Sequence, residues 1–357
     1  MELKIKKVEF EPDEKVKEPE FLIDTTKGKD MTKGFTLVVT FSRKWCVRPF
    51  FDAFNKLDID IDNCHLVLID NSANKLLEDA LRPYMEVYSE MFYTTRWFKT
   101  YRTGGGDRRG AEDKGFWKSK LPQIYWLHLD MIKLLTTEKF VLLEDDTLPP
   151  PDAVPALLKM LEDDEEIGIA TGIATGRSPF RHNPQRLGVH YFNRVGNKLL
   201  ERYTPDPDQK GSIEVDACGW YCCASYSDIW ADGFVGMSEY LDKIPRFALD
   251  GYHTNNLKRD GWKIVANFDL TCEHMNICPE GIIHWRPENA IRMLDVWLPK
   301  YKMYATDLKL SETNARQWIN DSKNVSLNFS SKRPELATLH LFENSAQDDK
   351  GSADKSS

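Results

Sequence analysis

Short continuous runs of apolar residues alternate along this chain with segments of helical periodicity, and this alternation constrains the fold most strongly. The runs expected to be strands span residues 35–43, 65–74, 140–146 and 167–174. The segments expected to be helices span residues 48–58, 75–88 with a break at Pro83, 120–135, and the stretch after an Asp152 N-cap. Strands that are apolar on both faces belong in a parallel sheet covered on both sides. The chain is therefore predicted to be α/β, with a mostly parallel sheet and helices on both faces.

The two ends of the chain differ from this central part. Residues 1–33 are predicted to be a charged N-terminal arm, and the polar residues 344–357 a disordered tail. The chain contains no run of 18 apolar residues, so no membrane span is expected. The N-terminus has no apolar signal-peptide core and the 7 cysteines are scattered, which predicts free thiols and a cytoplasmic location. The net charge of -8 weighs against nucleic-acid binding, although a local basic patch can override it.

Acidic residues follow two of the expected strands. Asp70 ends one of them, and Glu144, Asp145 and Asp146 end another. In an extended chain Glu144 and Asp146 point to the same side and Asp145 points away, which favours a structural role for Asp145. Two carboxylates at the carboxyl end of a strand suit Mg²⁺ or Mn²⁺, and the alternative is a solvated loop. Considered alone, Asp70 is better explained by a turn, because Asn71 and Ser72 follow it.

Two later segments add candidate residues. Residues 213–230 form a strand-like run of small, apolar and aromatic side chains. Residues 247–275 contain Asp250 before a short helical stretch, then a strand, and His274 near the end. Considered separately, Asp250 fits a helix cap and His274 fits a packed core histidine.

Five segments, in this order, resemble the nucleotide-sugar glycosyltransferases of family 2. Their sequences are LVVTFSR, LVLIDNSAN, KFVLLEDDTLPPPDAVPALLKML, VDACGWYCCASYSDIW and LDGYHTNNLKRDGWKIV. The resemblance covers residues 34–276 and implies a GT-A, Rossmann-like domain there. Residues 277–343 are expected to be a helical C-terminal extension, because residues 284–304 carry an apolar stripe at helical spacing.

The resemblance implies a metal-dependent, inverting transfer of a hexosyl or pentosyl group from a nucleoside-diphosphate sugar to an acceptor hydroxyl. It makes Asp250 the general base, and it assigns Asp146 and His274 to a Mn²⁺ or Mg²⁺ ion. The residues implied to contact the donor are Thr40, Asp70, Glu144 and Asp145. The residues implied to contact the acceptor are Gly219 and Trp220. The acceptor is expected to be a glycan, a protein or a modified nucleobase.

The chain departs from the family pattern at three places. Glu144 replaces the first aspartate of the D-x-D motif, and Leu249 precedes Asp250 where the family has a second acid. The segment at residues 92–120 is longer and more basic than the corresponding family segment, and its residues 94–120 form an insertion with aromatic residues and three consecutive glycines. This insertion is predicted to be a mobile loop that closes over the diphosphate, with Arg109 on the donor, or that grips an anionic acceptor. The alternatives are a nucleic-acid contact and a solvated surface loop.

Two other classes of protein compete with the glycosyltransferase. A nucleotidyltransferase has a related sheet, but it usually carries a glycine-rich signature after the first strand, where this chain has TFSRKWCVRPF. An inactive nucleotide-sugar-binding protein would not need an intact set of Glu144, Asp146, Asp250 and His274. The glycosyltransferase is therefore preferred.

Overall fold

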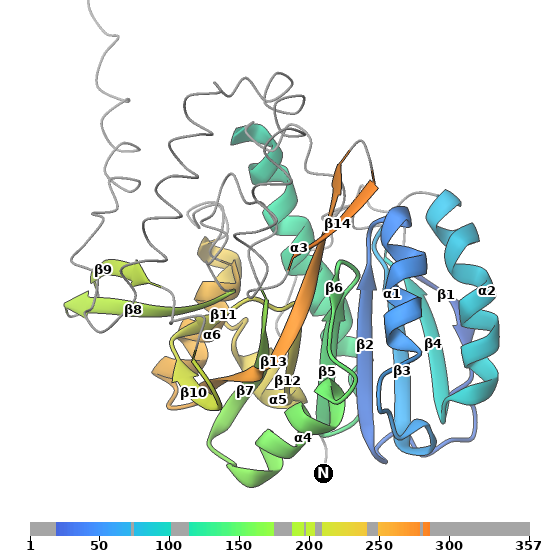
Figure 1. The fold of residues 1–357 in the computed structure, drawn as a ribbon, viewed down its shortest axis with the longest axis horizontal. Coiled ribbons are helices and arrows are strands. Elements are labelled where there is room, and N and C mark those ends of the chain that lie inside the picture. The colour runs from blue at the N-terminus through green and yellow to red at the C-terminus, as the bar shows by residue number, and fades with distance from the viewer. Residues whose placement is uncertain are drawn as a thin grey trace, which may run out of the picture.

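A computed structural model shows a mixed α/β fold built on one large sheet (Figure 1). The structure describes residues 19–72, 75–100, 114–174, 188–195, 198–203, 209–240, 249–278 and 281–285. The helices are α1 (Val47–Phe54), α2 (Lys75–Met91), α3 (Lys114–Leu134), α4 (Ala153–Asp163), α5 (Ser227–Asp232) and α6 (Leu249–Arg259). Short 3₁₀ turns are η1 (Lys44–Cys46), η2 (Ile61–Asn63) and η3 (Met237–Tyr240).

The main sheet has the order β1-β4-β3-β2-β5-β12-β7-β13-β10. Its strands are β1 (Glu20–Asp24), β2 (Phe35–Phe41), β3 (Cys64–Asp70), β4 (Thr94–Lys99), β5 (Lys139–Glu144), β7 (Ile167–Ala174), β10 (Ser212–Val215), β12 (Cys222–Tyr226) and β13 (Lys263–Cys278). Strands β4, β3, β2, β5, β7 and β13 run in one direction, while β1, β12 and β10 run against it. The predicted α/β class with a mostly parallel sheet is confirmed.

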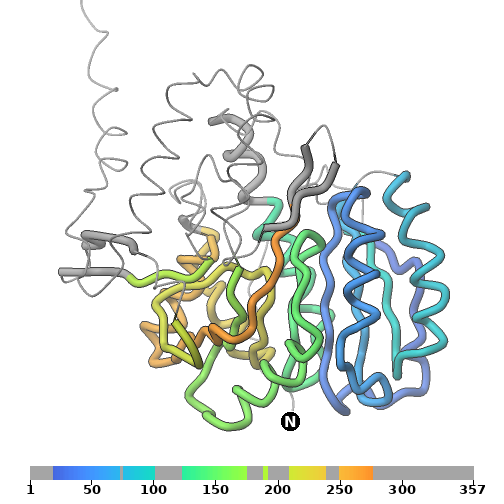
Figure 2. Tube along the Cα trace, in the orientation of Figure 1, coloured from blue at the N-terminus to red at the C-terminus, as the bar shows by residue number. Residues whose placement is uncertain are grey.

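Five further strands lie beside this path. Strands β6 (Thr147–Leu148) and β14 (Gly281–Trp285) pair with β13, and a small sheet contains β8 (Val189–Val195), β9 (Lys198–Tyr203) and β11 (Ala217–Cys218). In Figure 2, β13 (orange) runs beside the green segment that contains β6. This long strand therefore connects the main sheet to the turn that follows β5.

Helices cover both faces because successive strand side chains alternate between two cores. In β2, Leu37 and Val39 belong to the core under α1, α2 and α4, while Val38 belongs to the core under α3, α5 and α6. Helix α1 contributes three buried phenylalanines, one of which, Phe51, stacks on Tyr84 of α2 at 4.2 Å. Among the helices of the described residues, none has the length and apolar content that crossing a bilayer requires.

The structure corrects four local predictions. Helix α2 continues through Pro83. This proline has no amide to donate to the carbonyl of Asp79, a residue whose side chain is exposed. Part of the predicted N-terminal arm is strand β1, which pairs antiparallel with β4. The predicted mobile loop 94–120 begins with β4 and ends in α3.

The fourth correction concerns the predicted helical extension. Strand β13 runs to residue 278, across the predicted domain boundary after residue 276, and pairs with β14 as a hairpin. Residues 277, 278 and 281–285 are therefore strand, because a tertiary partner was available that helical periodicity cannot reveal. Residues 286–343, the tail 344–357 and residues 1–18 lie outside the described residues.

Candidate active site

The carboxyl ends of three adjacent parallel strands bring the first group of predicted residues together. Thr40 of β2 lies in register with Glu144 of β5 on one side and with Ile69 of β3 on the other. The next residue of β2 is in register with Asp70. The N–H of Asp145 donates to the carbonyl of Thr40 at 3.1 Å. The predicted convergence of the two acidic strand ends is therefore observed at one edge of the sheet.

Asp145 anchors the turn that follows β2. Its Oδ2 accepts hydrogen bonds from the backbone N–H groups of Ser42 at 2.8 Å and Arg43 at 2.9 Å. Its other oxygen, Oδ1, accepts from the guanidinium of Arg43. Asp145 is buried, so these donors replace the water that its charge would otherwise require. This agrees with the structural role expected from alternation, while a contact with the donor stays a prediction.

Asp146 and His274 meet because β6 pairs with β13. Residue His274 is in register with Thr147, and the N–H of Met275 donates to the carbonyl of Asp146 at 2.7 Å. The imidazole Nε2 of His274 lies 3.4 Å from Oδ2 of Asp146. Both side chains are buried. The two residues that the sequence assigned to an ion are therefore in contact.

Arg43 also contacts this pair, although sequence reasoning gave it no role. Its Nη1 lies 2.9 Å from Oδ2 of Asp146, in addition to the contact with Asp145. Burial would lower the pKa of the Arg43 guanidinium, but the two carboxylates outweigh that effect and raise the pKa well above its usual value. Strict alternation had turned Asp145 away from Asp146. Strand β5 ends at Glu144, however, so residues 145 and 146 form a turn and share one arginine.

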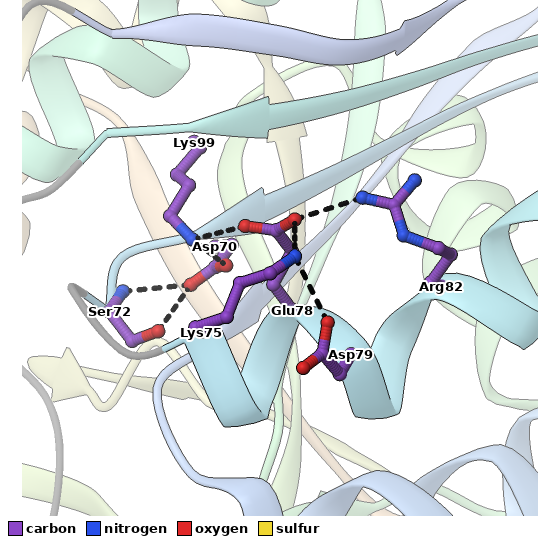
Figure 3. Close-up of polar contacts among 7 residues, drawn as sticks. All are labelled: Asp70, Ser72, Lys75, Glu78, Asp79, Arg82 and Lys99. Carbon is purple, nitrogen blue, oxygen red and sulfur yellow. Dashed lines mark hydrogen bonds and ion pairs between the residues drawn. The ribbon is translucent and has the colours of Figure 1, made fainter.

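Asp70 is buried within a network of charged side chains (Figure 3). Its Oδ1 accepts from the N–H of Ser72 at 2.9 Å and from the Ser72 hydroxyl at 2.7 Å. Its Oδ2 lies 3.3 Å from Nζ of Lys99, which also donates to Glu78 at 2.9 Å. Burial raises the pKa of Asp70, and the contacts with Ser72 and Lys99 offset part of that rise. Both oxygens of Asp70 thus have partners inside the protein.

The cluster around Asp70 continues along α2. Lys75 and Arg82 contact the same oxygen of Glu78, at 2.7 and 2.9 Å (Figure 3). Lys75 and Lys99 lower the pKa of Glu78 to about 2, and Arg82 contributes to the same effect. Lys99 had been grouped with the basic residues of the predicted loop. The signal that would have found this pair is a buried strand that ends in a lysine, next to a strand that ends in an acid.

Asp250 lies in the first turn of α6, where its Oδ1 accepts from the N–H of Gly251 at 2.8 Å. Its charge adds to the effect of burial in raising the pKa of the Cys218 thiol, so the two residues are close. The segment from Cys218 to Tyr221 also reaches the acidic turn, because the N–H of Glu144 donates to the carbonyl of Tyr221 at 3.0 Å. Asp250 and Glu144 are thus both near one short segment, Cys218 to Tyr221, and Asp250 lies inside the first turn of α6, so the helix-cap reading stays a prediction.

The two predicted acceptor residues lie in that segment. The N–H of Gly219 donates to the carbonyl of Gly188 at 2.8 Å, and a Cβ at Gly219 would meet the Tyr221 ring at 2.8 Å. Trp220 is 6% exposed and packs on the ring of His128, with 4.1 Å between the centroids. The structure therefore places most of the indole in a core, and its contact with an acceptor stays a prediction. Arg109, predicted to contact the donor, lies outside the described residues.

The residues present fit a divalent ion in part. A carboxylate oxygen and an imidazole nitrogen that converge, as in Asp146 and His274, form a donor set that suits Mn²⁺. Across the part of the chain that the structure describes, no group of three or more His, Cys, Asp or Glu is placed to hold a metal. Ions of this class are often held by one or two protein ligands together with substrate phosphates. The six cysteines with described side chains are free and buried, and none of them is needed for this site.

Comparisons with known proteins add only an outline likeness. No family model and no curated protein sequence matches the chain. The structure of GalNAc-T7 with UDP, GalNAc and Mn²⁺ is similar with a TM-score of 0.47 and 12% identity, over 83% of this chain and 55% of that chain. The present chain thus spans about half of that protein. The structure of S. aureus TarS 1–349 has a TM-score of 0.38 and 10% identity, over 83% of this chain and 72% of that chain. These scores and identities are too low to transfer an activity or a ligand.

Proposed function

We propose that this chain is a metal-dependent, inverting glycosyltransferase of the GT-A type, related to family 2. It would move a hexosyl or pentosyl group from a nucleoside-diphosphate sugar to an acceptor hydroxyl. The observation that supports this proposal best is the contact between Asp146 and His274 at the carboxyl ends of β2, β3 and β5. Ligands of open α/β sheets bind at this edge, and the two side chains are of the types that hold Mn²⁺.

Asp146 and His274 would hold the ion, with Mn²⁺ or Mg²⁺ as the candidates. When bound, such an ion stabilises the negative charge that develops on a departing diphosphate. Thr40, Glu144 and Asp145 lie at the same edge and are proposed to line the donor site. Asp70 is proposed to face the nucleobase, although a base would have to share its oxygens with Ser72 and Lys99.

Asp250 is proposed to act as the general base. As the acceptor oxygen bonds to the anomeric carbon, the bond from that carbon to the diphosphate oxygen breaks. The hydroxyl proton passes to the Asp250 carboxylate. Attack from the side opposite the diphosphate inverts the anomeric centre. Asp250 is half-buried and near Cys218, in the segment whose Tyr221 carbonyl accepts from the N–H of Glu144, and this position supports the role.

The described part of the basic insertion does not favour a nucleic-acid acceptor. Arg96 is buried and donates to the carbonyl of Leu134, Trp97 is fully buried, and Lys99 is ion-paired with Asp70 and Glu78. These side chains therefore support the sheet and are not displayed to solvent. A glycan or protein acceptor is proposed in preference to a modified nucleobase.

The metal assignment is tested with a panel of nucleotide sugars, measuring hydrolysis of the donor with and without Mn²⁺. We expect hydrolysis to require the divalent ion and to be lost in Asp146→Ala. Asp163→Ala serves as the matched control, because Asp163 is an exposed acid on α4 with 60% of its side chain accessible. Turnover that is equal with and without divalent ions would contradict the metal assignment.

The base assignment is tested separately with Asp250→Asn. The amide preserves the size of the side chain but cannot accept the hydroxyl proton, so transfer should be lost. Binding of UDP, followed by the shift in melting temperature, should remain. If the variant transfers sugar at the rate of the unmodified protein, another group is the base.

A further inference from the structure

Arg43 occupies the point where the two aspartates of the acidic turn meet. We infer that this arginine is a built-in counter-cation that a divalent ion must displace from Asp146, so that the affinity for the ion depends on a bound diphosphate. The inference rests on the proposed metal site at Asp146 and His274. It concerns a residue of this chain to which neither the sequence patterns nor the proposed reaction assigns a task.

The geometry shows a shared oxygen. Oδ2 of Asp146 lies 2.9 Å from Nη1 of Arg43 and 3.4 Å from Nε2 of His274. The side chains of Arg43 and Asp146 are 10% and 0% exposed, so little water screens them. A divalent ion on this oxygen would face the guanidinium at close range, where like charges repel strongly. Ion and guanidinium therefore compete for the carboxylate of Asp146.

Arg43 can leave Asp146 without leaving the site. Asp145 accepts from both the backbone N–H and the guanidinium of Arg43, and it also accepts from the N–H of Ser42. The carboxylate of Asp145 therefore holds the backbone of Arg43 in place whether or not the guanidinium contacts Asp146. The guanidinium cannot be neutralised by losing its proton under ordinary conditions, so competition ends only when the side chain moves.

A diphosphate supplies the partner that the displaced guanidinium needs. Arg43 lies two residues beyond the end of β2, at the strand ends where the donor is proposed to bind. Guanidinium groups pair well with phosphate oxygens, so a nucleoside diphosphate replaces the Asp146 carboxylate as the partner of Arg43. The ion and the diphosphate should therefore strengthen each other's binding. By linkage, the factor is the same in both directions.

The test uses Arg43→Gln and measures binding of Mn²⁺ by electron paramagnetic resonance of the free ion, with and without UDP. In the unmodified protein we expect weak binding of Mn²⁺ alone and binding at least about tenfold tighter with UDP, within the usual range of such couplings. In Arg43→Gln we expect Mn²⁺ alone to bind about tenfold tighter than in the unmodified protein, with a smaller effect of UDP. Arg48→Gln is the matched control, because the Arg48 side chain is 88% exposed on α1, and it should behave like the unmodified protein.

Three outcomes would overturn the inference. Equal Mn²⁺ affinities of Arg43→Gln and the unmodified protein without UDP would show that no competition exists, and the metal site would still stand. Weaker Mn²⁺ binding in Arg43→Gln would show that the arginine orients Asp146 for the ion. A lack of Mn²⁺ binding by both proteins, with and without UDP, would refute the proposed metal site and the inference together.

A second variant covers the case in which Arg43→Gln does not fold. In Arg43→Lys the charge remains, but the side chain is one bond shorter than the path to the Arg43 Nη1, so the ammonium should contact Asp146 less closely. The Mn²⁺ affinity without UDP should lie above that of the unmodified protein, and Mn²⁺ should raise the melting temperature by a larger amount. An unchanged affinity and an unchanged thermal response in Arg43→Lys would refute the competition.

Discussion

Replacing Lys99 with methionine tests whether the charged cluster at the ends of β3 and β4 stabilises the fold. Methionine keeps most of the aliphatic length of lysine but removes the ammonium. In the structure this ammonium lies 3.3 Å from Asp70 and 2.9 Å from Glu78, and the Lys99 side chain is 4% exposed (Figure 3). The substitution therefore leaves the fully buried carboxylate of Asp70 without its counter-charge.

The expected loss is about 3 kcal/mol in the free energy of unfolding at pH 7. Removing one partner of a buried ion pair typically costs about 3–5 kcal/mol, because the other charge stays desolvated. The lower end applies here, since Ser72 still donates twice to Asp70 and Glu78 keeps its contacts with Lys75 and Arg82.

The same loss should shrink as the pH falls from 7 to 5. Burial already raises the pKa of Asp70, and removing Lys99 raises that pKa further. An acid whose pKa is higher in the folded state destabilises that state most when it is ionised. Protonation of Asp70 should therefore reduce the variant's loss in free energy of unfolding as the pH falls. With Lys99 present the pKa of Glu78 is about 2. An ordinary glutamate titrates near about 4.3, so Glu78 stays largely ionised in both proteins throughout this window.

Urea unfolding of both proteins at pH 7 and pH 5 measures these differences. Lys159→Met is the matched control, because Lys159 is 70% exposed and its pair with Asp163 should be worth at most about 0.5 kcal/mol. In an Asp70→Asn background, Lys99→Met should cost less than about 1 kcal/mol, since no buried charge is left unpaired. A loss below about 1 kcal/mol at pH 7, or a loss that grows on acidification, would refute the reasoning.

Two further predictions concern backbone geometry and buried histidines. Gly34 has φ of 72° and a Cβ there would lie 1.9 Å from the carbonyl oxygen of Asn63, so Gly34→Ala should lower the free energy of unfolding by about 3 kcal/mol. Gly28→Ala, at φ of 78° with no atom nearby, should cost about 1 kcal/mol in the same urea experiment. Burial lowers the pKa of both His128 and His253 to about 3, so each protonates more readily when unfolded. Their stabilising contribution is complete above about pH 6.5 and is lost on acidification, by about 1.4 kcal/mol per pH unit for each histidine. His128→Phe should remove one such slope from the pH dependence of unfolding, and an unchanged slope would contradict the assignment.

Local patterns were sufficient for the central strands and most helices. The four predicted apolar runs became strands at Phe35–Phe41, Cys64–Asp70, Lys139–Glu144 and Ile167–Ala174. Such runs are buried on both faces, so their composition carries the information about their position. The break predicted at Pro83 was wrong, because packing of the flanking apolar residues of α2 against the sheet keeps the helix continuous. Strand β1 was missed, because an edge strand that is partly exposed has no continuous apolar pattern.

The sequence by itself determined that the acidic residues stand at the ends of buried strands, since a short apolar run followed by carboxylates is visible locally. Only the tertiary structure decided which of these residues meet. Asp146 reaches His274 because β6 pairs with the far part of β13, and Arg43 reaches both aspartates because β2 lies beside β5. Asp70 is held by Lys99 because β3 lies beside β4. Pairing between strands distant in the chain depends on the order of the whole sheet, and local periodicity does not encode that order.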